Sequence, residues 1–174
     1  MIAIACVDEN WGIGKCGELL FHIKKDMESF KRLTENGIVI MGRRTWESLP
    51  KKPLPNRINV IVTSDDSCIS TENTYFTRIE DVMNLVGRLQ KETGIGEFKT
   101  FLIGGEKLYN TLLTKCSVAL ITKVHSVDIN ADTFFPNLDK SSYWVTRLHS
   151  DDSMVDEDSG LSFDFLRYYN TYCE

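Results

Sequence analysis

Two hydrophobic patterns alternate along this chain, and their alternation limits the fold to one class. Short β-branched or aromatic runs bounded by turn residues are typical of buried strands. They lie at residues 1–7, 38–42, 58–63, 73–77, 98–103, 117–124, 143–149 and 162–170. Between several of them, apolar residues recur at helical spacing, within residues 24–34, 79–89 and 108–113. Strands that alternate with helices predict an α/β fold with a largely parallel sheet.

The last two runs are joined without a helical pattern, so we expect them to pair as an antiparallel hairpin. Their connection is acidic, which predicts a solvated loop; it contains Asp151, Asp152, Asp156, Glu157 and Asp158. A chain of 174 residues is the size of one domain. We therefore expect a single domain over residues 1–174. It would hold a predominantly parallel eight-stranded sheet, an antiparallel C-terminal hairpin and four flanking helices.

The charge distribution limits the partners of this chain. The formal net charge is −5, which argues against nucleic-acid binding, because that function needs a basic face. Residues 43–57 are nevertheless basic, with five cations and one acid. A local positive segment on an acidic protein predicts a small anionic ligand.

Cysteine and histidine spacing argues against disulfides and metal sites. The five cysteines are scattered and form no CxxC pair, which is typical of reduced thiols in a cytoplasmic protein. The three histidines are isolated, so we expect no metal. The N-terminal segment lacks the basic start of a signal peptide, and no uncharged run is long enough to span a membrane.

Gly12, Gly14 and Gly17 match the GxGxxG pattern of dinucleotide-binding loops. The context differs from that motif, because Glu18 to Phe21 follow before any helical period begins. We therefore interpret the segment as a flexible glycine-rich loop that could close over a ligand.

Asp26 is the first candidate for a functional side chain. It lies three positions after Ile23 and four before Phe30, which puts its carboxylate on the apolar side of its helix. Burial there without a partner would raise its pKa and destabilise the fold. Either a cap, a cation or a ligand donor compensates for that burial, or Asp26 is simply an acid favoured by the dipole at a helix start. The residues alone leave both interpretations open.

Two glycine turns that open helices are candidate phosphate sites. Gly42 joins a strand to a helix start with Arg43, Arg44 and Thr45, where free backbone N–H groups and cations converge. The pair Gly104-Gly105 ends another strand in the same way. An ordinary capped helix with solvated arginines is the alternative for the first turn, and a simple tight turn is the alternative for the second.

Three more polar residues are candidates for anion binding. Thr63 and Ser64 end a strand with hydroxyls. Arg57 follows a proline-rich turn that would position it rigidly, and a fixed guanidinium suits a carboxylate. Each of them taken singly could also be a surface residue.

Together these residues resemble the dihydrofolate reductase family over nearly the whole chain. Six motifs follow the family's order and spacing: WGIGKCG at 11–17, D-x-x-x-F-K at 26–31, IMGRRTWES at 40–48, PLPNR at 53–57, FLIGGEKLY at 101–109 and ADTFFP at 131–136. The resemblance implies a monomeric cytoplasmic enzyme that reduces 7,8-dihydrofolate to tetrahydrofolate with NADPH. A hydride would pass from nicotinamide C4 to pterin C6, with protonation of N5.

The resemblance also implies roles for individual residues. Asp26 would bind the pterin's amino and ring N–H groups, with Thr122 supporting the carboxylate and Phe21 as the third catalytic residue. The implied substrate-binding residues are Ile4, Ala5, Cys6, Met27, Phe30, Lys31, Leu49, Leu54, Arg57 and Ile103. The implied cofactor-binding residues are Cys6, Ile13, Gly14, Gly42, Arg43, Arg44, Thr45, Ser48, Thr63, Ser64, Ile103, Gly104, Gly105, Glu106, Lys107, Leu108 and Tyr109. In this family the Gly104-Gly105 peptide is often cis.

The chain departs from the family pattern in the loop before its first helix. Leu20-Phe21 stands where Pro-Trp is usual, and Lys24 replaces a frequent proline. Phe21 keeps a ring but has no N–H, so we expect altered loop dynamics with the chemistry retained. Two other functions stay open: a riboflavin-pathway pyrimidine reductase of the same fold, and a non-catalytic NADPH-binding module.

Overall fold

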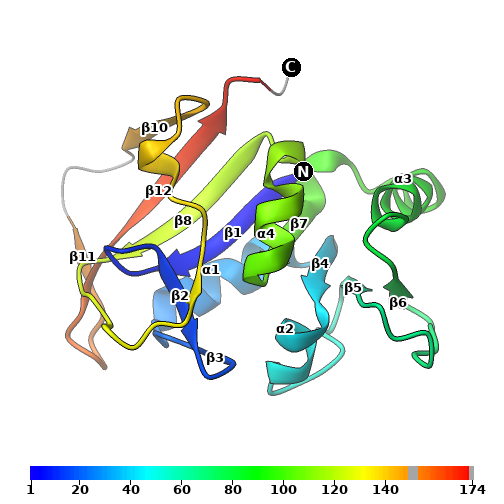
Figure 1. The fold of residues 1–174 in the computed structure, drawn as a ribbon, viewed down its shortest axis with the longest axis horizontal. Coiled ribbons are helices and arrows are strands. Elements are labelled where there is room, and N and C mark those ends of the chain that lie inside the picture. Colours follow the sequence, from blue (N-terminus) through cyan, green and yellow to red (C-terminus); the bar gives the residue numbers. More distant parts are fainter. Residues whose placement is uncertain (149–152, 173–174) are drawn as a thin grey trace.

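The computed structural model describes residues 1–148 and 153–172 and is built on one large twisted sheet (Figure 1). Along the sheet the strands run in the order β10-β12-β8-β1-β7-β4-β5-β6. Their bounds are β1 Ile2–Val7, β4 Ile38–Gly42, β5 Ile58–Val62, β6 Thr74–Thr77, β7 Thr100–Gly104, β8 Val118–Val124, β10 Trp144–Leu148 and β12 Ser162–Asn170. The pairs from β8 through β6 are parallel. The expected eight-stranded, predominantly parallel sheet is confirmed.

The C-terminal strands reverse direction, as predicted. Strand β12 pairs antiparallel with both β8 and β10. A short strand that the sequence did not predict, β11 (Met154–Val155), also pairs with β12. The expected solvated connection is wrong for Asp156, whose side chain is buried and accepts the backbone N–H of Lys24 at 3.2 Å. Asp151 and Asp152 lie outside the described residues.

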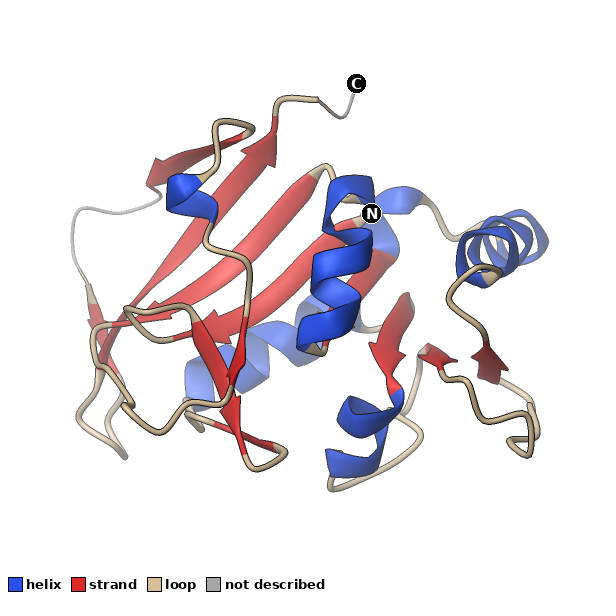
Figure 2. Ribbon diagram, viewed as in Figure 1, coloured by secondary structure: helices blue, strands red, loops and turns tan. Residues whose placement is uncertain are grey.

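Four helices flank the sheet, as expected, and they cover both of its faces (Figure 2). They are α1 Lys24–Thr34, α2 Arg43–Ser48, α3 Val82–Thr93 and α4 Glu106–Leu112, with single 3-10 turns at η1 Glu97–Lys99, η2 Leu113–Lys115 and η3 Leu138–Lys140. One prediction is wrong in detail: α3 begins after Ile79, and both Ile79 and Met83 are exposed. Apolar spacing alone could not separate these two from Val82, Val86 and Leu89, which are buried.

The glycine-rich segment forms a β-hairpin. Strands β2 (Gly12–Lys15) and β3 (Glu18–Leu19) pair through a turn at Cys16 and Gly17, whose φ values are 51° and 86°. Strand β9 (Thr133–Phe134) completes this small second sheet. The hairpin opens no helix, so rejecting the dinucleotide-loop interpretation of GxGxxG is confirmed.

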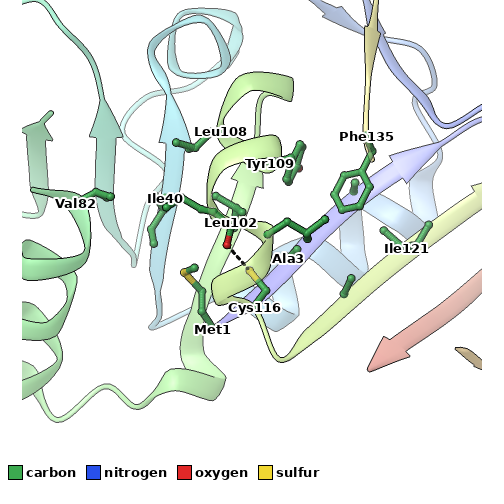
Figure 3. Packing of buried hydrophobic residues seen from close by; sticks show 14 of the residues in the cluster. Met1, Ala3, Ile40, Val82, Leu102, Leu108, Tyr109, Cys116, Ile121 and Phe135 are labelled. Carbon is green, nitrogen blue, oxygen red and sulfur yellow. Dashed lines mark hydrogen bonds between the residues drawn. The ribbon is translucent and has the colours of Figure 1, made fainter. Parts of the chain in front are cut away.

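The larger core lies between α4, α3 and one face of the sheet (Figure 3). Alternation along β1 explains this division, because Ala3, Ala5 and Val7 join the larger core while Ile2 and Ile4 face the opposite side. Helix α1 lies behind the sheet in the view of Figure 1. No helix among the described residues is long and apolar enough to cross a membrane.

Candidate active site

The carboxylate of Asp26 sits where α1 crosses the sheet. Asp26 lies in the first turn of α1, and Thr122 of β8 donates a hydrogen bond from Oγ1 to Asp26 Oδ1 at 2.5 Å. Burial raises the pKa of Asp26, and the Thr122 hydrogen bond partly opposes this. No cation within 4 Å pairs with this carboxylate among the residues that the structure describes. A carboxylate in this position still has lone pairs for a ligand that donates N–H groups.

Strand β1 contributes two residues near Asp26, Cys6 and Ile4. Burial raises the pKa of the Cys6 thiol, and the nearby Asp26 charge adds to this effect, so Cys6 is a neutral thiol. The buried Tyr109 hydroxyl donates to the carbonyl of Ile4 at 2.6 Å. That bond fixes the direction of the Ile4 carbonyl, which keeps a second lone pair for a ligand.

Arg57 lies immediately before β5 and contacts α1. Its side chain is 8% exposed, its Nη2 donates to the carbonyl of Lys31 at 3.3 Å, and its guanidinium lies 5.7 Å from the Phe30 ring centroid. Burial lowers the pKa of Arg57. Its Nε finds no hydrogen-bond partner among the described residues. The guanidinium is thus fixed in position, and not all of its N–H donors form hydrogen bonds to the protein.

A buried asparagine that the sequence analysis did not single out builds the segment before Arg57. Asn59 is fully buried; its side-chain amide donates to the carbonyls of Leu54 and Arg57 at 3.1 and 3.0 Å and accepts the N–H of Leu54 at 3.0 Å. The preceding Lys52-Pro53 peptide is cis. The position of Arg57 therefore depends on Asn59 as well as on the prolines.

The two glycine turns meet face to face. The Gly104-Gly105 peptide is cis, as the resemblance implied, and a Cβ placed on Gly42 would lie 3.7 Å from the backbone nitrogen of Gly105. Gly42 and Gly105 are the N-caps of α2 and α4, and neither helix start receives a side-chain cap from them. Two sets of first-turn N–H groups thus face one region, which suits an anion.

A substitution at Gly104 should damage this arrangement. Gly104 has a φ of 144°, and an added Cβ would lie 3.0 Å from Thr45 Oγ1. Gly104→Ala should therefore lower the free energy of unfolding by about 1–3 kcal/mol, measured by urea denaturation. The control is Gly87→Ala in α3, where an added Cβ meets nothing within 4 Å; this change should stabilise by about 0.5–1 kcal/mol. Equal stability of the two variants would contradict the tight contact.

The chain's similarity to known proteins agrees with this geometry. A family model described as dihydrofolate reductase matches residues 1–170. The chain belongs to the dihydrofolate reductase family. It is 32% identical over 165 residues to the dihydrofolate reductase of Bacillus subtilis, covering 95% of this chain and 91% of that protein. It is 33% identical to that of Schistosoma mansoni, covering 95% and 93%.

Some relatives are longer than this chain. The bifunctional dihydrofolate reductase-thymidylate synthase of Paramecium tetraurelia is 32% identical over 163 residues; these make up 92% of this chain and 32% of that protein. A dihydrofolate reductase uses a nicotinamide cofactor and acts on a small-molecule substrate.

The residues that the family resemblance singled out lie in several different environments. Ile4, Leu49, Leu54 and Ile103 are partly buried on the cluster formed by Val39, Met41, Ile61 and Phe101. Phe21 packs on a separate cluster of Ile23, Val124 and Phe163, near Cys6. Ala5 is buried in the larger core, Ile13 packs against that core, and Met27 and Lys31 are exposed on α1.

The residues around the two turns differ in what they can offer a ligand. The side chains of Leu108 and Tyr109 are buried in the core, so only their backbone groups could reach the turn region. The Ser48 hydroxyl donates to the carbonyl of Thr45 at 2.9 Å, and Thr63 Oγ1 accepts the N–H of Asp65 at 3.1 Å. The remaining members offer backbone or exposed side-chain groups: Gly14, Arg43, Arg44, Ser64, Glu106 and Lys107.

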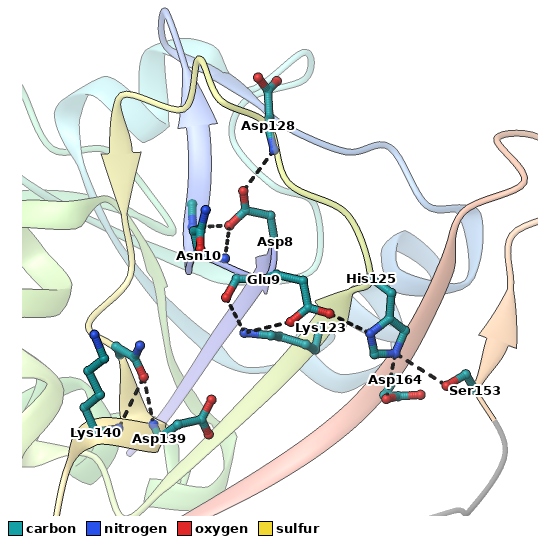
Figure 4. Close-up of polar contacts among 12 residues, drawn as sticks. Asp8, Glu9, Asn10, Lys123, His125, Asp128, Asp139, Lys140, Ser153 and Asp164 are labelled. Atoms are coloured by element: carbon teal, nitrogen blue, oxygen red, sulfur yellow. Dashed lines mark hydrogen bonds and ion pairs between the residues drawn. The ribbon is translucent and has the colours of Figure 1, made fainter.

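A fully buried acid, Asp8, holds the glycine hairpin and was missed by the sequence analysis. Its Oδ1 accepts the N–H groups of Asn10 and Gly12 at 2.8 and 2.7 Å, and its Oδ2 accepts that of Asp128 at 3.1 Å (Figure 4). The run Asp8 to Gly12 is a pattern that favours a side-chain-capped turn, and this could have been read from the sequence. Farther along the hairpin, Asp132 Oδ2 accepts the N–H of Cys16 at 2.7 Å.

His125 forms a second missed cluster next to Asp8 (Figure 4). Its Nδ1 lies 2.8 Å from Glu9 Oε1 and its Nε2 lies 2.9 Å from Asp164 Oδ2. Lys123 Nζ donates to the Glu9 carbonyl at 3.2 Å and lies 4.5 Å from the Trp11 ring centroid. The imidazole thus joins the β1–β2 turn to β12. No cluster of metal-binding side chains is found within residues 1–148 and 153–172.

The His125 cluster makes stability depend on pH. The hydrogen bond to Glu9 raises the pKa of His125, and Asp164 adds to this while desolvation opposes it. A histidine whose pKa is raised by folding stabilises fully below its unfolded value and loses that contribution as pH rises through its folded value. His125→Gln should therefore cost less than about 1 kcal/mol, because the site is partly exposed, with the loss present at pH 6 and absent at pH 9. Urea denaturation at both values measures it. The matched control is the exposed His22→Gln, and a loss independent of pH would argue against a charged His125.

Proposed function

We propose that this chain reduces 7,8-dihydrofolate to 5,6,7,8-tetrahydrofolate with NADPH. The observation that carries the proposal is Asp26: a largely buried carboxylate with a raised pKa, supported by the hydroxyl of Thr122 and, in the described part of the chain, by no cation. A pterin or a diaminopyrimidine presents an amino group beside a ring N–H, and this pair of donors compensates for burial of such an acid.

The substrate side of the proposal follows the surface between β1, α1 and β5. Asp26 binds the amino-pyrimidine edge, Phe30 packs on the ring, and the Ile4 and Ile103 carbonyls accept from it. Ala5, Cys6, Met27, Lys31, Leu49 and Leu54 line the remainder. Arg57 binds a carboxylate of the substrate tail through the terminal guanidinium N–H groups that the Lys31 carbonyl does not accept. This tail contact is what favours a folate over the ribosyl-aminopyrimidine of a riboflavin-pathway reductase.

The cofactor side of the proposal uses the two facing helix starts. Backbone N–H groups of residues 43–45 and 105–107 suit the pyrophosphate, and Gly42 lets the two turns lie close together, since a Cβ there would be 3.7 Å from the Gly105 nitrogen. Arg44, Thr63 and Ser64 favour NADPH over NADH, because a guanidinium and two hydroxyls suit a 2′-phosphate. Cys6, Ile13 and Gly14 would hold the nicotinamide, which would supply the hydride.

The protein's own chemistry is mostly positioning. Both rings must be held in one apolar region at short distance, which is a proximity effect. Asp26 is the ionisable side chain placed to polarise the pterin, acting on N5 through the ring or a water because it binds the opposite edge. Its raised pKa brings proton exchange closer to neutral pH, as general acid catalysis requires. Thr122 orients the carboxylate, and the Phe21 ring closes the hairpin side.

Mixing the protein with NADPH and dihydrofolate and following the cofactor absorbance tests the proposal. Rapid loss of absorbance that needs dihydrofolate supports it. Binding of NADPH without consumption would support the non-catalytic module instead, and consumption only with a ribosyl-aminopyrimidine would support the alternative reductase. We further propose a cytoplasmic monomer, because one domain supplies both proposed sites and Cys6, Cys16 and Cys68 are free thiols.

A further inference from the structure

A cavity of about 530 Å³ lies beside Asp26 on the flank of α1 that faces β12. Helix α1 contributes Lys25, Ser29, Arg32 and Leu33 to its wall. At 100° per residue these positions share one flank of the helix, whereas Met27 and Lys31, which we assign to the substrate, share the other. We call this space the rear cavity. Its inner end is formed by Asp26, Ile4, Thr122 and Phe30, and its outer end by exposed residues of α1.

The opposite wall comes from the sheet. In the β8–β12 pair, Thr122 is opposite Phe165 and Leu120 is opposite Arg167. Side chains at alternate positions share a face, so Leu120 and Arg167 lie on the same side as Thr122, which contacts Asp26. Both residues line the rear cavity. Ser29 on the helix and Leu120 on the sheet therefore line the space from opposite walls, and neither side chain fills it.

The lining is polar enough to hold water. A water molecule occupies about 30 Å³ of liquid, and a cavity holds water when it is roomy and offers several polar partners. Asp26, Ser29 and Thr122 provide such partners at the inner end. Arg167 also lines the cavity, which adds a cationic side chain to these polar groups.

We propose that the rear cavity hydrates Asp26 from the side opposite the substrate, and that Ser29 and Leu120, by leaving this space open, set how readily the carboxylate ionises. The inference deepens the proposed function and rests on it only for its catalytic consequence. Water in the rear cavity stabilises the charged form of the Asp26 carboxylate, while a bound substrate excludes water from the opposite side of the carboxylate. Ser29 and Leu120 are thus tuning residues that act through Asp26.

The charges around Asp26 do not replace this effect. Lys25, Glu28 and Arg32 of α1 line the cavity and are exposed, and Arg167 faces it from β12. Cys6 and Tyr109 lie close enough for the Asp26 charge to raise the pKa of each. Desolvation is the main cause of the raised pKa of Asp26 itself. Further desolvation should therefore move its ionisation strongly.

Filling the cavity with uncharged side chains tests the inference. Ser29→Phe and Leu120→Phe add volume from opposite walls without changing charge, and Ser29→Ala removes the hydroxyl but adds no volume. The measurement is the pH titration of the Asp26 side-chain carboxyl by ¹³C NMR in the ligand-free protein. Both Phe variants should bind the proton about tenfold more tightly than the wild type, and Ser29→Ala should titrate like the wild type.

Other outcomes would overturn the inference. Thermal unfolding shows whether each Phe variant is folded. A folded Phe variant that titrates like the wild type would show that the cavity does not hydrate Asp26. The same holds if Ser29→Ala shifts the titration as far as Ser29→Phe does. Because two walls supply filling variants, failure of one to fold leaves the other as the test. The titration needs neither NADPH nor dihydrofolate, so a protein that shifts as expected but consumes no NADPH would refute the proposed function and leave this inference standing.

Discussion

Asp26→Asn should slow dihydrofolate reduction at neutral pH by about 10²–10⁴-fold, the range for loss of a general acid or base. The amide keeps the size of the side chain and can still accept from Thr122, but it carries no charge and cannot exchange a proton. Steady-state kinetics across pH measure the effect, and the pH dependence of the residual rate should flatten. Wild-type turnover in this variant at pH 7 would show that Asp26 does not have the assigned role.

The same substitution should make the fold more stable, which separates a catalytic loss from a folding defect. The folded-state pKa of Asp26 is raised, mainly by desolvation. Such a carboxyl costs stability as pH rises from its unfolded pKa through its folded pKa. Asp26→Asn should therefore melt above the wild type at pH 8, and the difference should shrink toward pH 4. Thermal unfolding at the two values measures it, and a less stable variant at pH 8 would contradict the buried charge.

Arg57→Leu should raise the KM for dihydrofolate by about 10–100-fold, since a charge-assisted hydrogen bond to a carboxylate contributes about 1.5–3 kcal/mol. The affinity for NADPH should not change, because Arg57 lies against α1 and Phe30, away from the glycine turns. Stability should change little, since the guanidinium makes one backbone hydrogen bond and leaves Nε unpaired. Separate titrations of the two ligands check both expectations.

Two controls sharpen the Arg57 test. Lys51→Leu removes an exposed cation from the same basic segment and should leave the KM within about twofold, because an exposed charge contributes little. Arg57→Lys keeps the charge but loses the planar fork, so its KM should fall between those of the wild type and Arg57→Leu. If Lys51→Leu matched Arg57→Leu, the effect would be general electrostatics and the specific carboxylate contact would be wrong.

Most of the secondary structure followed from local pattern. Helix α1 was expected over residues 24–34 and spans them, and the strand at 38–42 is equally well placed. The spacing of apolar residues within each segment indicates both the type of element and the side of it that must be buried. The predicted helix stripe failed at Ile79, because a spacing shows which residues could share a face but not where the helix begins.

The polar residues show what local pattern could not reach. The sequence placed Asp26 on an apolar helix face, yet its two possible explanations stayed open until Thr122 was found against it. Asp156 sits in an acidic segment that looks solvated, but the fold brings it beneath the first turn of α1, 132 residues away in sequence. His125 likewise gained its role only from the distant residues Glu9 and Asp164, and Asp8 gained its contact with Asp128 in the same way.

The sequence by itself determined the class of the fold, the glycine turns that open two helices and the presence of a costly acid on α1. Those properties depend on neighbours within a few residues, where chain geometry is regular. Tertiary structure alone decided which side chains meet: the crossovers that put β8 beside β1 bring Thr122 to Asp26, and the β8–β12 register opens the rear cavity behind it. Contacts between distant segments depend on how whole elements pack, and no local pattern encodes that packing.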